Sequence, residues 1–346
     1  MQDLALRDYN EGLGIMESVK IFSSGGGVQS TAVLVLSAQR KINYPIHVFA
    51  NVGDRAESAE TIAYVRDILR PYAKTNGIQW ADVCKKDKAG KAIDLLDKLE
   101  QSTKSVPIPV RMAGSGAPGN RGCTVEWKIK PVANFIKSLI PVDMVKKISK
   151  EIREMAPDIK RQADFLAKST MSMDDEAEYS KSYAIAIKNI KFKAQSDMYS
   201  RYYPIILGKG ISTDEAQRAK KETGFAHYQA EYPLIALGLS RMDCIKIIED
   251  AGLPPAPKSA CWFCPYKTKA KWQDLRSSDL ERFEAAVTLE KLLHSRSVAL
   301  GRGGCFFTST GTSKNLFLDE ITSPNHQYDL FHGFDDGECE SGYCWT

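Results

Sequence analysis

A run of three glycines near the start of the chain constrains the fold more than any other feature. It lies in the stretch Ser23-Ser24-Gly25-Gly26-Gly27-Val28-Gln29-Ser30-Thr31. The apolar residues 19–22 before it predict a short buried strand, and residues 31–36 after it predict the first turns of a helix. Glycine lets a ligand approach the backbone closely, and the N-terminus of a helix offers unpaired N–H groups to an anion. We therefore expect a phosphate-binding loop, whose contacts would be Ser24, Gly25, Gly26, Gly27, Gln29 and Ser30.

The segments that follow alternate between strand and helix patterns. Residues 45–51 and 78–84 predict a second and a third strand, with a helix over 58–72 between them. This alternation predicts a parallel, doubly wound α/β sheet, on which ligands bind beyond the carboxyl ends of the strands. Asn51 begins the polar loop after the second strand, so we expect it to contact the same ligand. His47 lies within the second apolar run, and we expect it to be a core residue.

The chain divides by composition into three regions. Residues 1–140 and 201–256 carry the α/β pattern and form the predicted nucleotide-binding domain. Residues 141–200 predict amphipathic helices over 144–155, 158–167 and 173–193, rich in Lys, Glu and Asp, as an insertion. This insertion fits a cap, an oligomerisation surface, a polyanion contact or, with its mixed charges, a solvated face. Residues 257–346 form a Cys-rich region that we expect to dock on the site.

Composition narrows the cellular context but not the partner. No stretch approaches the ~20 apolar residues of a membrane span, and the start lacks a basic region followed by an apolar one, so no secretory signal is predicted. We expect a cytoplasmic protein without membrane contact. In that compartment, eight cysteines favour metal binding or thiol chemistry over disulfides. The net charge of +4 is too small to identify a partner.

Three later segments carry residues suited to chemistry. A glycine-rich loop over 113–122 leads into Arg121-Gly-Cys123-Thr-Val-Glu-Trp-Lys128, where Thr124 is the expected N-cap of a helix. A second glycine loop, Gly210-Ile-Ser-Thr-Asp-Glu215-Ala-Gln-Arg218, follows a predicted strand over 202–208. The third segment, Cys261-Trp-Phe-Cys264, has the spacing with which two thiolates reach one metal. Residues 232–235 read as a further edge element of the sheet.

Together, these motifs resemble the phosphoadenosine phosphosulfate (PAPS) reductase-like family of the adenine nucleotide alpha-hydrolase, or PP-loop ATP pyrophosphatase, superfamily. The similarity rests on the first glycine loop, Arg-x-Cys-Thr followed by Lys-x-x-Pro, Gly-Ile-x-x-x-Glu-x-x-Arg and Cys-x-x-Cys-Pro. It implies a five-stranded parallel sheet with helices on both faces. It also implies that Arg121 and Lys128 face phosphates, and that Gly210 and Glu215 contact the nucleotide or the substrate.

The resemblance also implies an iron–sulfur centre near the nucleotide. Four thiolates complete a 4Fe-4S cluster, and the assigned ligands are Cys123, Cys261, Cys264 and Cys344. Zinc would accept the same thiolates and is one alternative, and a site without metal is the other. Cys339 is assigned as nucleophile or persulfide carrier, because Glu338-Cys339 resembles the tail pattern of the reductases; the two tail cysteines could exchange roles. The remaining cysteines, 84, 244 and 305, lie in apolar segments and are expected in the core.

Two enzymatic functions and one without turnover follow from this resemblance. The favoured one is an ATP pyrophosphatase of the sulfurtransferase kind, which forms AMP and pyrophosphate, with Mg²⁺ as an allowed cofactor, and activates an acceptor for sulfur insertion. The second is a PAPS reductase that releases sulfite, and the third is a nucleotide-binding subunit or sensor. Gln29 replaces the acid of the usual PP-loop, and the tail lacks the histidine of the reductase motif. Allowed macromolecular partners are a nucleic acid, a sulfur-donor protein and a second copy of the chain.

Overall fold

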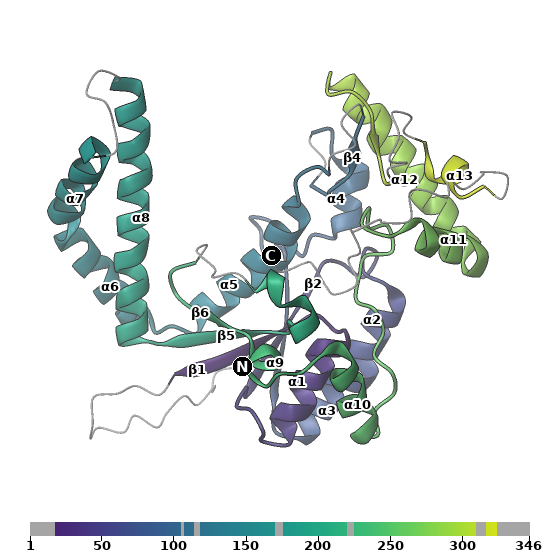
Figure 1. The fold of residues 1–346 in the computed structure, drawn as a ribbon, viewed down its shortest axis with the longest axis horizontal. Coiled ribbons are helices and arrows are strands. Elements are labelled where there is room, and N and C mark those ends of the chain that lie inside the picture. Colours follow the sequence, from purple (N-terminus) through teal and green to yellow (C-terminus); the bar gives the residue numbers. More distant parts are fainter. Residues whose placement is uncertain are drawn as a thin grey trace. The chain divides into compact units, whose positions relative to one another are not determined.

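The structure, a computed structural model, describes residues 18–104, 107–113, 118–169, 176–219, 225–308 and 316–323. Its centre is a five-stranded parallel sheet with the strand order β3-β2-β1-β5-β6 (Figure 1). The strands are β1 (Val19–Ser24), β2 (Ile46–Asn51), β3 (Gln79–Cys84), β5 (Ile205–Lys209) and β6 (Gln229–Glu231). The predicted α/β class and parallel sheet are therefore confirmed.

The register of the first three strands sets the edge at which their loops meet. Ile21 lies opposite Ile46 between β1 and β2, and Asn51 lies opposite Cys84 between β2 and β3. Parallel strands end at the same edge of a sheet, so the glycine loop after β1 and the polar loop after β2 lie at one edge. His47 is fully buried between Phe22 and Trp80, as expected for a core residue, and burial lowers its pKa to about 3.

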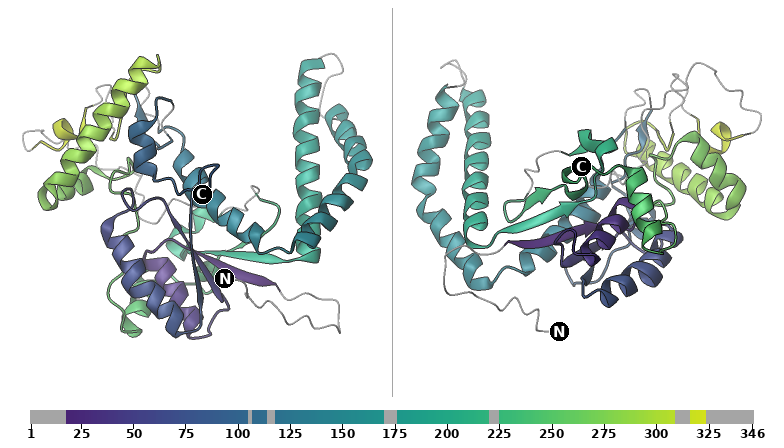
Figure 2. Two further views of the ribbon diagram at one scale, coloured as in Figure 1. Left: turned by 180° about the vertical axis from the view of Figure 1, so that it is seen from behind. Right: turned by 60° about the horizontal axis from the view of Figure 1, so that its bottom comes forward.

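Residues group into two compact units, the first of which is largely helical. Its described residues are 18–20, 136–169, 176–207 and 225–231. It holds three helices, of which α8 runs back alongside α7 (Figure 2): α6 (Val142–Glu154), α7 (Ala156–Ser169) and α8 (Glu176–Tyr202). The stretch predicted as a helical insertion is helical, and α8 continues through Tyr202. The strand predicted to begin at Tyr202 therefore begins three residues later, at Ile205.

The second unit carries the loops of interest. Its described residues fall within 21–135, 208–219 and 232–323. Helix α1 (Val28–Ala38) packs side by side with α10 (Arg241–Asp250), and Phe22, Val33 and Ile248 belong to the apolar cluster around them (Figure 1). A second cluster joins α1 and β2 to the helices between β2 and β3 through Leu34, Phe49 and Leu69. These clusters hold in place the strand before the glycine loop and the helix after it.

The helices of this unit, with α5 crossing its boundary, follow the strands in chain order. They are α1 (Val28–Ala38), α2 (Ala59–Tyr64), η1 (Val65–Leu69), α3 (Arg70–Thr75), α4 (Leu95–Gln101), η2 (Thr124–Ile129), α5 (Lys130–Ser138), η3 (Thr213–Arg218), α9 (Pro233–Ala236), α10 (Arg241–Asp250), α11 (Lys269–Ser278), α12 (Leu280–Ala299) and α13 (Leu318–Ile321). A two-stranded antiparallel sheet joins β4 (Arg111–Met112) to β7 (Cys305–Phe306).

A third apolar cluster joins earlier segments of this unit to its C-terminal part. Trp127, Phe263, Trp272 and Phe307 are its largest fully or almost fully buried members. Trp127 comes from the Arg121–Lys128 segment and Phe263 from the Cys-x-x-Cys turn. One core therefore holds two segments that are far apart in the sequence, and both carry predicted site residues.

Two local predictions were wrong. Residues 232–235 were expected as an edge of the sheet, but Pro233–Ala236 form the short helix α9, since proline fits the first turn of a helix and cannot donate to a strand ladder. Thr124 was expected to cap a helix, but it lies inside one: Cys123 already has helical dihedral angles, and Thr124 is buried. Within the described ranges, no helix is long and apolar enough to cross a membrane.

Candidate nucleotide site

The first glycine loop is held in shape by its own hydroxyl groups. Ser30 and Thr31 each donate a hydrogen bond from the side chain to the carbonyl oxygen of Gly27, at 2.9 Å. The Gly27 N–H in turn donates to Ser30 Oγ at 3.0 Å. Ser23 and Ser24 contribute buried hydroxyl groups that have no hydrogen-bond partner within the described part of the chain. A buried hydroxyl without a partner is costly, so these two groups suit a bound ligand.

The three glycines of this loop serve three different purposes. Gly26 has φ +75°, and a Cβ there would lie 3.0 Å from side-chain carbons of Thr61 and Val65, so internal packing requires this glycine. A Cβ on Gly27 would make ordinary contacts of 3.6–3.7 Å with Pro257 and Ser259. A Cβ on Gly25 would meet nothing within 4 Å. Gly25 is therefore the glycine that borders open space.

The second glycine loop packs directly against the first. A Cβ on Gly210 would lie 3.3 Å from the Cβ of Gln29, which explains the glycine there. The side chain of Gln29 donates to Ser212 Oγ at 3.5 Å and accepts from Arg241 Nη1 at 3.4 Å. Gln29 thus links the two glycine loops to the first turn of α10.

Glu215 and Asn51, two of the predicted nucleotide contacts, have partners within the protein. Glu215 is buried and forms an ion pair with Arg218 at 2.5 Å; burial raises the pKa of its carboxyl group. Asn51 shapes the loop after β2, because its Oδ1 accepts from the Gly53 N–H at 2.8 Å and its Nδ2 donates to Asp54 at 2.7 Å. Both residues therefore help to build the loops around the candidate site.

Glu57 is a site residue that the sequence analysis did not identify. Its carboxylate is fully buried, and neither oxygen has a hydrogen-bond partner in the part of the chain that the structure describes. Lys128 is also buried, and its Nζ lies 3.9 Å from Glu57 Oε2. A buried carboxylate needs a compensating charge, which the ammonium group supplies. The pair places a buried lysine next to the loop that ends β2.

The Cys-x-x-Cys segment runs along the same loops. Glu57 and Cys261 form an antiparallel bridge, flanked by hydrogen bonds from Ser58 N–H to the Ala260 carbonyl (3.2 Å) and from Trp262 N–H to the Ala56 carbonyl (3.3 Å). Earlier in this segment, Pro257 and Ser259 lie beside Gly27. Residues 257–262 therefore extend from the first glycine loop to the Glu57–Lys128 pair.

Arg121 is attached to the same segment farther along. Its Nε donates to the Tyr266 hydroxyl at 2.8 Å, and its guanidinium lies 4.3 Å from the centre of the Tyr266 ring. The neighbouring helix η2 is anchored by Trp127, whose Nε1 donates to the Ile93 carbonyl at 3.1 Å. The structure thus brings the Arg121–Lys128 and Cys261–Cys264 segments together, as the sequence analysis requires.

The structure places only some of the predicted metal ligands against the same apolar cluster. Cys123 and Cys261 both pack against the third apolar cluster, and the Cys264 N–H donates to the Cys261 carbonyl at 3.2 Å. Among the described residues, however, no three His, Cys, Asp or Glu side chains come together closely enough to hold a metal ion. Cys339 and Cys344 lie outside the described residues, so the iron–sulfur centre and the tail nucleophile remain predictions.

The structure separates two inert cysteines from these candidates. Cys244 and Cys305 are buried in apolar clusters, as expected, and burial raises the pKa of their thiols to about 12 and about 11. A thiol with so high a pKa is a poor nucleophile and a poor metal ligand at neutral pH. The third cysteine expected in the core, Cys84, is only half-buried at the end of β3.

Comparison of the chain with models of protein families, with curated proteins and with solved structures finds no match.

Proposed function

We propose that the chain is an adenine-nucleotide-dependent sulfur-transfer enzyme that binds ATP at the first glycine loop and cleaves it to AMP and pyrophosphate. One observation carries the proposal: residues 257–266 link Gly27, Glu57 and Arg121 and bring the Cys-x-x-Cys turn to the same group of loops. A glycine loop alone would serve any phosphate ligand. Cations and thiols beside it suit a reaction at the phosphates that is followed by transfer of sulfur.

The residues of the site have different roles in the proposed first step. The hydroxyl groups of Ser23 and Ser24 and the open backbone at Gly25 would receive phosphate oxygens. A substrate oxygen would attack the α-phosphorus, and the bond to the bridging oxygen of pyrophosphate would break. Negative charge then grows on the departing pyrophosphate, and a positive side chain placed there stabilises the transition state. Arg121 and Lys128 are the cations proposed for this role.

The second step removes AMP from the activated acceptor. A sulfur nucleophile would attack the adenylated carbon, forming the carbon–sulfur bond as the carbon–oxygen bond breaks and AMP leaves with the electron pair. Glu57 contributes by position rather than by contact with the nucleotide, because its carboxylate holds the Lys128 ammonium in place. Tyr266 does the same for Arg121 through its hydroxyl group and its ring.

Two lysines that lie two residues apart on one continuous helical segment provide a matched test. Lys128 is buried beside Glu57, whereas Lys130 is exposed and pairs with Glu126 on the surface. Lys128→Met should lower the rate of pyrophosphate release from ATP by at least tenfold, while Lys130→Met should leave it unchanged. Circular dichroism would verify that both variants fold. Equal rates in the two variants would remove Lys128 from the mechanism.

A further inference from the structure

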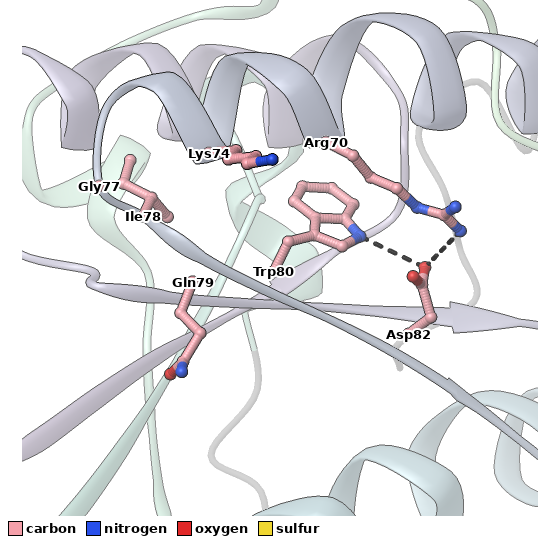
Figure 3. A pocket seen from close by; sticks show the side chains of 7 residues that line it. All are labelled: Arg70, Lys74, Gly77, Ile78, Gln79, Trp80 and Asp82. Atoms are coloured by element: carbon pink, nitrogen blue, oxygen red, sulfur yellow. Dashed lines mark hydrogen bonds and ion pairs between the residues drawn. The ribbon is translucent and has the colours of Figure 1, made fainter. Parts of the chain in front are cut away.

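An open cavity of about 440 Å³ lies beside β3, apart from the glycine loops (Figure 3). The residues that line it come from α3, from the turn after α3 and from the first part of β3. Trp80 lies between the side chains of Arg70 and Lys74 in this view. Asp82 fixes the arrangement, because it accepts from Trp80 Nε1 at 3.3 Å and pairs with Arg70 at 2.9 Å.

The chemistry of this cavity suits a ligand that is both aromatic and anionic. The indole of Trp80 is half-buried against the cluster that contains Phe49, which keeps the ring rigid. Arg70 and Lys74 place two positive charges near the ring, and among the described residues only the Arg70 charge is offset, by Asp82. A rigid aromatic surface between cations is the arrangement on which nucleic-acid bases stack while their phosphates are neutralised.

The positive charge continues along the sheet edge beyond the cavity. β3 stands at one end of the order of the five described strands, and the chain turns after it through Lys86, Lys88 and Lys91. All three are exposed, and their ammonium groups have no ion-pair partner within the described residues. The acid in this turn, Asp87, accepts backbone N–H groups of the turn itself.

We propose that the cavity at Trp80 and the basic turn after β3 bind single-stranded nucleic acid. One base stacks on Trp80 with its phosphates near Arg70 and Lys74, and the strand continues along β3 to the lysines of the turn. Six residues of extended chain, at about 3.3 Å each, separate Trp80 from Lys86 by about 20 Å. This distance is longer than one nucleotide. The surface therefore fits a strand rather than a free mononucleotide, and it is separate from the nucleotide site proposed above.

Fluorescence anisotropy with a labelled 15-residue oligo(dT) and the full chain, without ATP, tests this surface. The double variant Lys74→Glu/Lys88→Glu should weaken binding at least tenfold. It should also reduce the slope of log K against log salt by about 1.4, since each phosphate contact to a single strand contributes about 0.7. Lys246→Glu, an exposed lysine on α10, is the matched control and should bind like the wild type.

Trp80 is tested by a pair of variants. Trp80→Ala should weaken binding about 5- to 100-fold, the range for loss of one stacked base, and Trp80→Phe should recover most of the affinity if the fold is intact. Gly25→Ala should leave oligonucleotide binding unchanged, which separates this surface from the glycine loop. Equal affinity of the double variant and the control would overturn the proposal. The proposal would also be overturned if AMP displaced the oligonucleotide at AMP concentrations near the dissociation constant of AMP. That result would indicate a mononucleotide site.

Discussion

Substitution of the three adjacent glycines one at a time separates the ligand-binding role of the first loop from its structural role. Gly25→Ala adds a methyl group to open space, Gly26→Ala adds one against Thr61 and Val65, and Gly27→Ala adds one at ordinary contact distance from Ser259. We expect loss of ATP binding without loss of stability only for Gly25→Ala.

The expected magnitudes follow from the geometry at each position. Gly26→Ala should lower the free energy of unfolding by about 2–4 kcal/mol, since the left-handed conformation costs ~1–2 kcal/mol and the 3.0 Å contacts add a similar amount. Gly25→Ala and Gly27→Ala should change it by no more than ~0.5 kcal/mol. Loss of one hydrogen bond to a charged phosphate is worth about 1.5–3 kcal/mol, so Gly25→Ala should weaken ATP binding roughly 10- to 100-fold.

Urea denaturation and isothermal titration calorimetry with ATP measure the two quantities independently. If Gly25→Ala binds ATP as tightly as the wild type, Gly25 does not contact the ligand. A large loss of stability in Gly25→Ala would contradict the open space beside this glycine. Gly27→Ala is the internal control, because its methyl group faces residues 257–259 and should not disturb a ligand.

Three further predictions concern other parts of the second unit. Arg121→Ala should lower turnover about 100-fold or more. Tyr266→Phe should lower turnover only several-fold, because this substitution removes one hydrogen bond to Arg121 and keeps the ring. Equal losses of turnover in the two variants would contradict the role of Arg121. Glu290 is buried, and its pKa is raised to about 7, so the folded state holds its proton where the unfolded state loses it. The free energy of unfolding of the wild type should therefore fall by about 3 kcal/mol between pH 4.5 and 7.5, relative to that of Glu290→Gln. If the two proteins show the same pH dependence, the protonation of Glu290 does not contribute to stability. Protein purified anaerobically with iron supplied should contain iron and sulfide in near-equal amounts, and Cys261→Ser should lose both whereas Cys339→Ser should keep them; zinc in their place would rule out the cluster.

The sequence predicts the parts of this site that depend on local pattern. The glycine loop, its flanking strand and helix, and the existence of the first three strands follow from apolar runs and from glycine chemistry. The sequence also predicts Ser240 as the N-cap of the helix that follows it, because serine favours this position; in α10 its side chain accepts from the Asp243 N–H. In these cases the residues that decide the structure are neighbours in the chain, so a local pattern is enough to predict it.

The features that the sequence analysis missed depend on distant contacts. Glu57 is an acid in a polar loop, which normally indicates a solvated side chain. In the structure its side chain is buried, and its backbone pairs with Cys261, which is far away in the sequence. Pro233 begins a short helix immediately after β6, and an apolar run of four residues cannot distinguish this from a strand. Gly26 is required by Thr61 and Val65 of the next helical segments, which no local pattern reveals.

The most direct test of the central claim is an anaerobic incubation of the protein with ATP and, separately, with PAPS, in the presence of a persulfide sulfur donor and a thiol reductant. Pyrophosphate and AMP are measured in the first reaction and sulfite in the second, with Arg121→Ala as the control for contaminating enzymes. Without an acceptor in the mixture, water supplies the oxygen that attacks the α-phosphorus. The proposed function therefore predicts pyrophosphate and AMP from ATP, in equal amounts and dependent on Arg121, and no sulfite from PAPS. Sulfite from PAPS without cleavage of ATP would contradict it and identify a sulfonucleotide reductase, and tight ATP binding without either product would identify a nucleotide-binding protein without turnover.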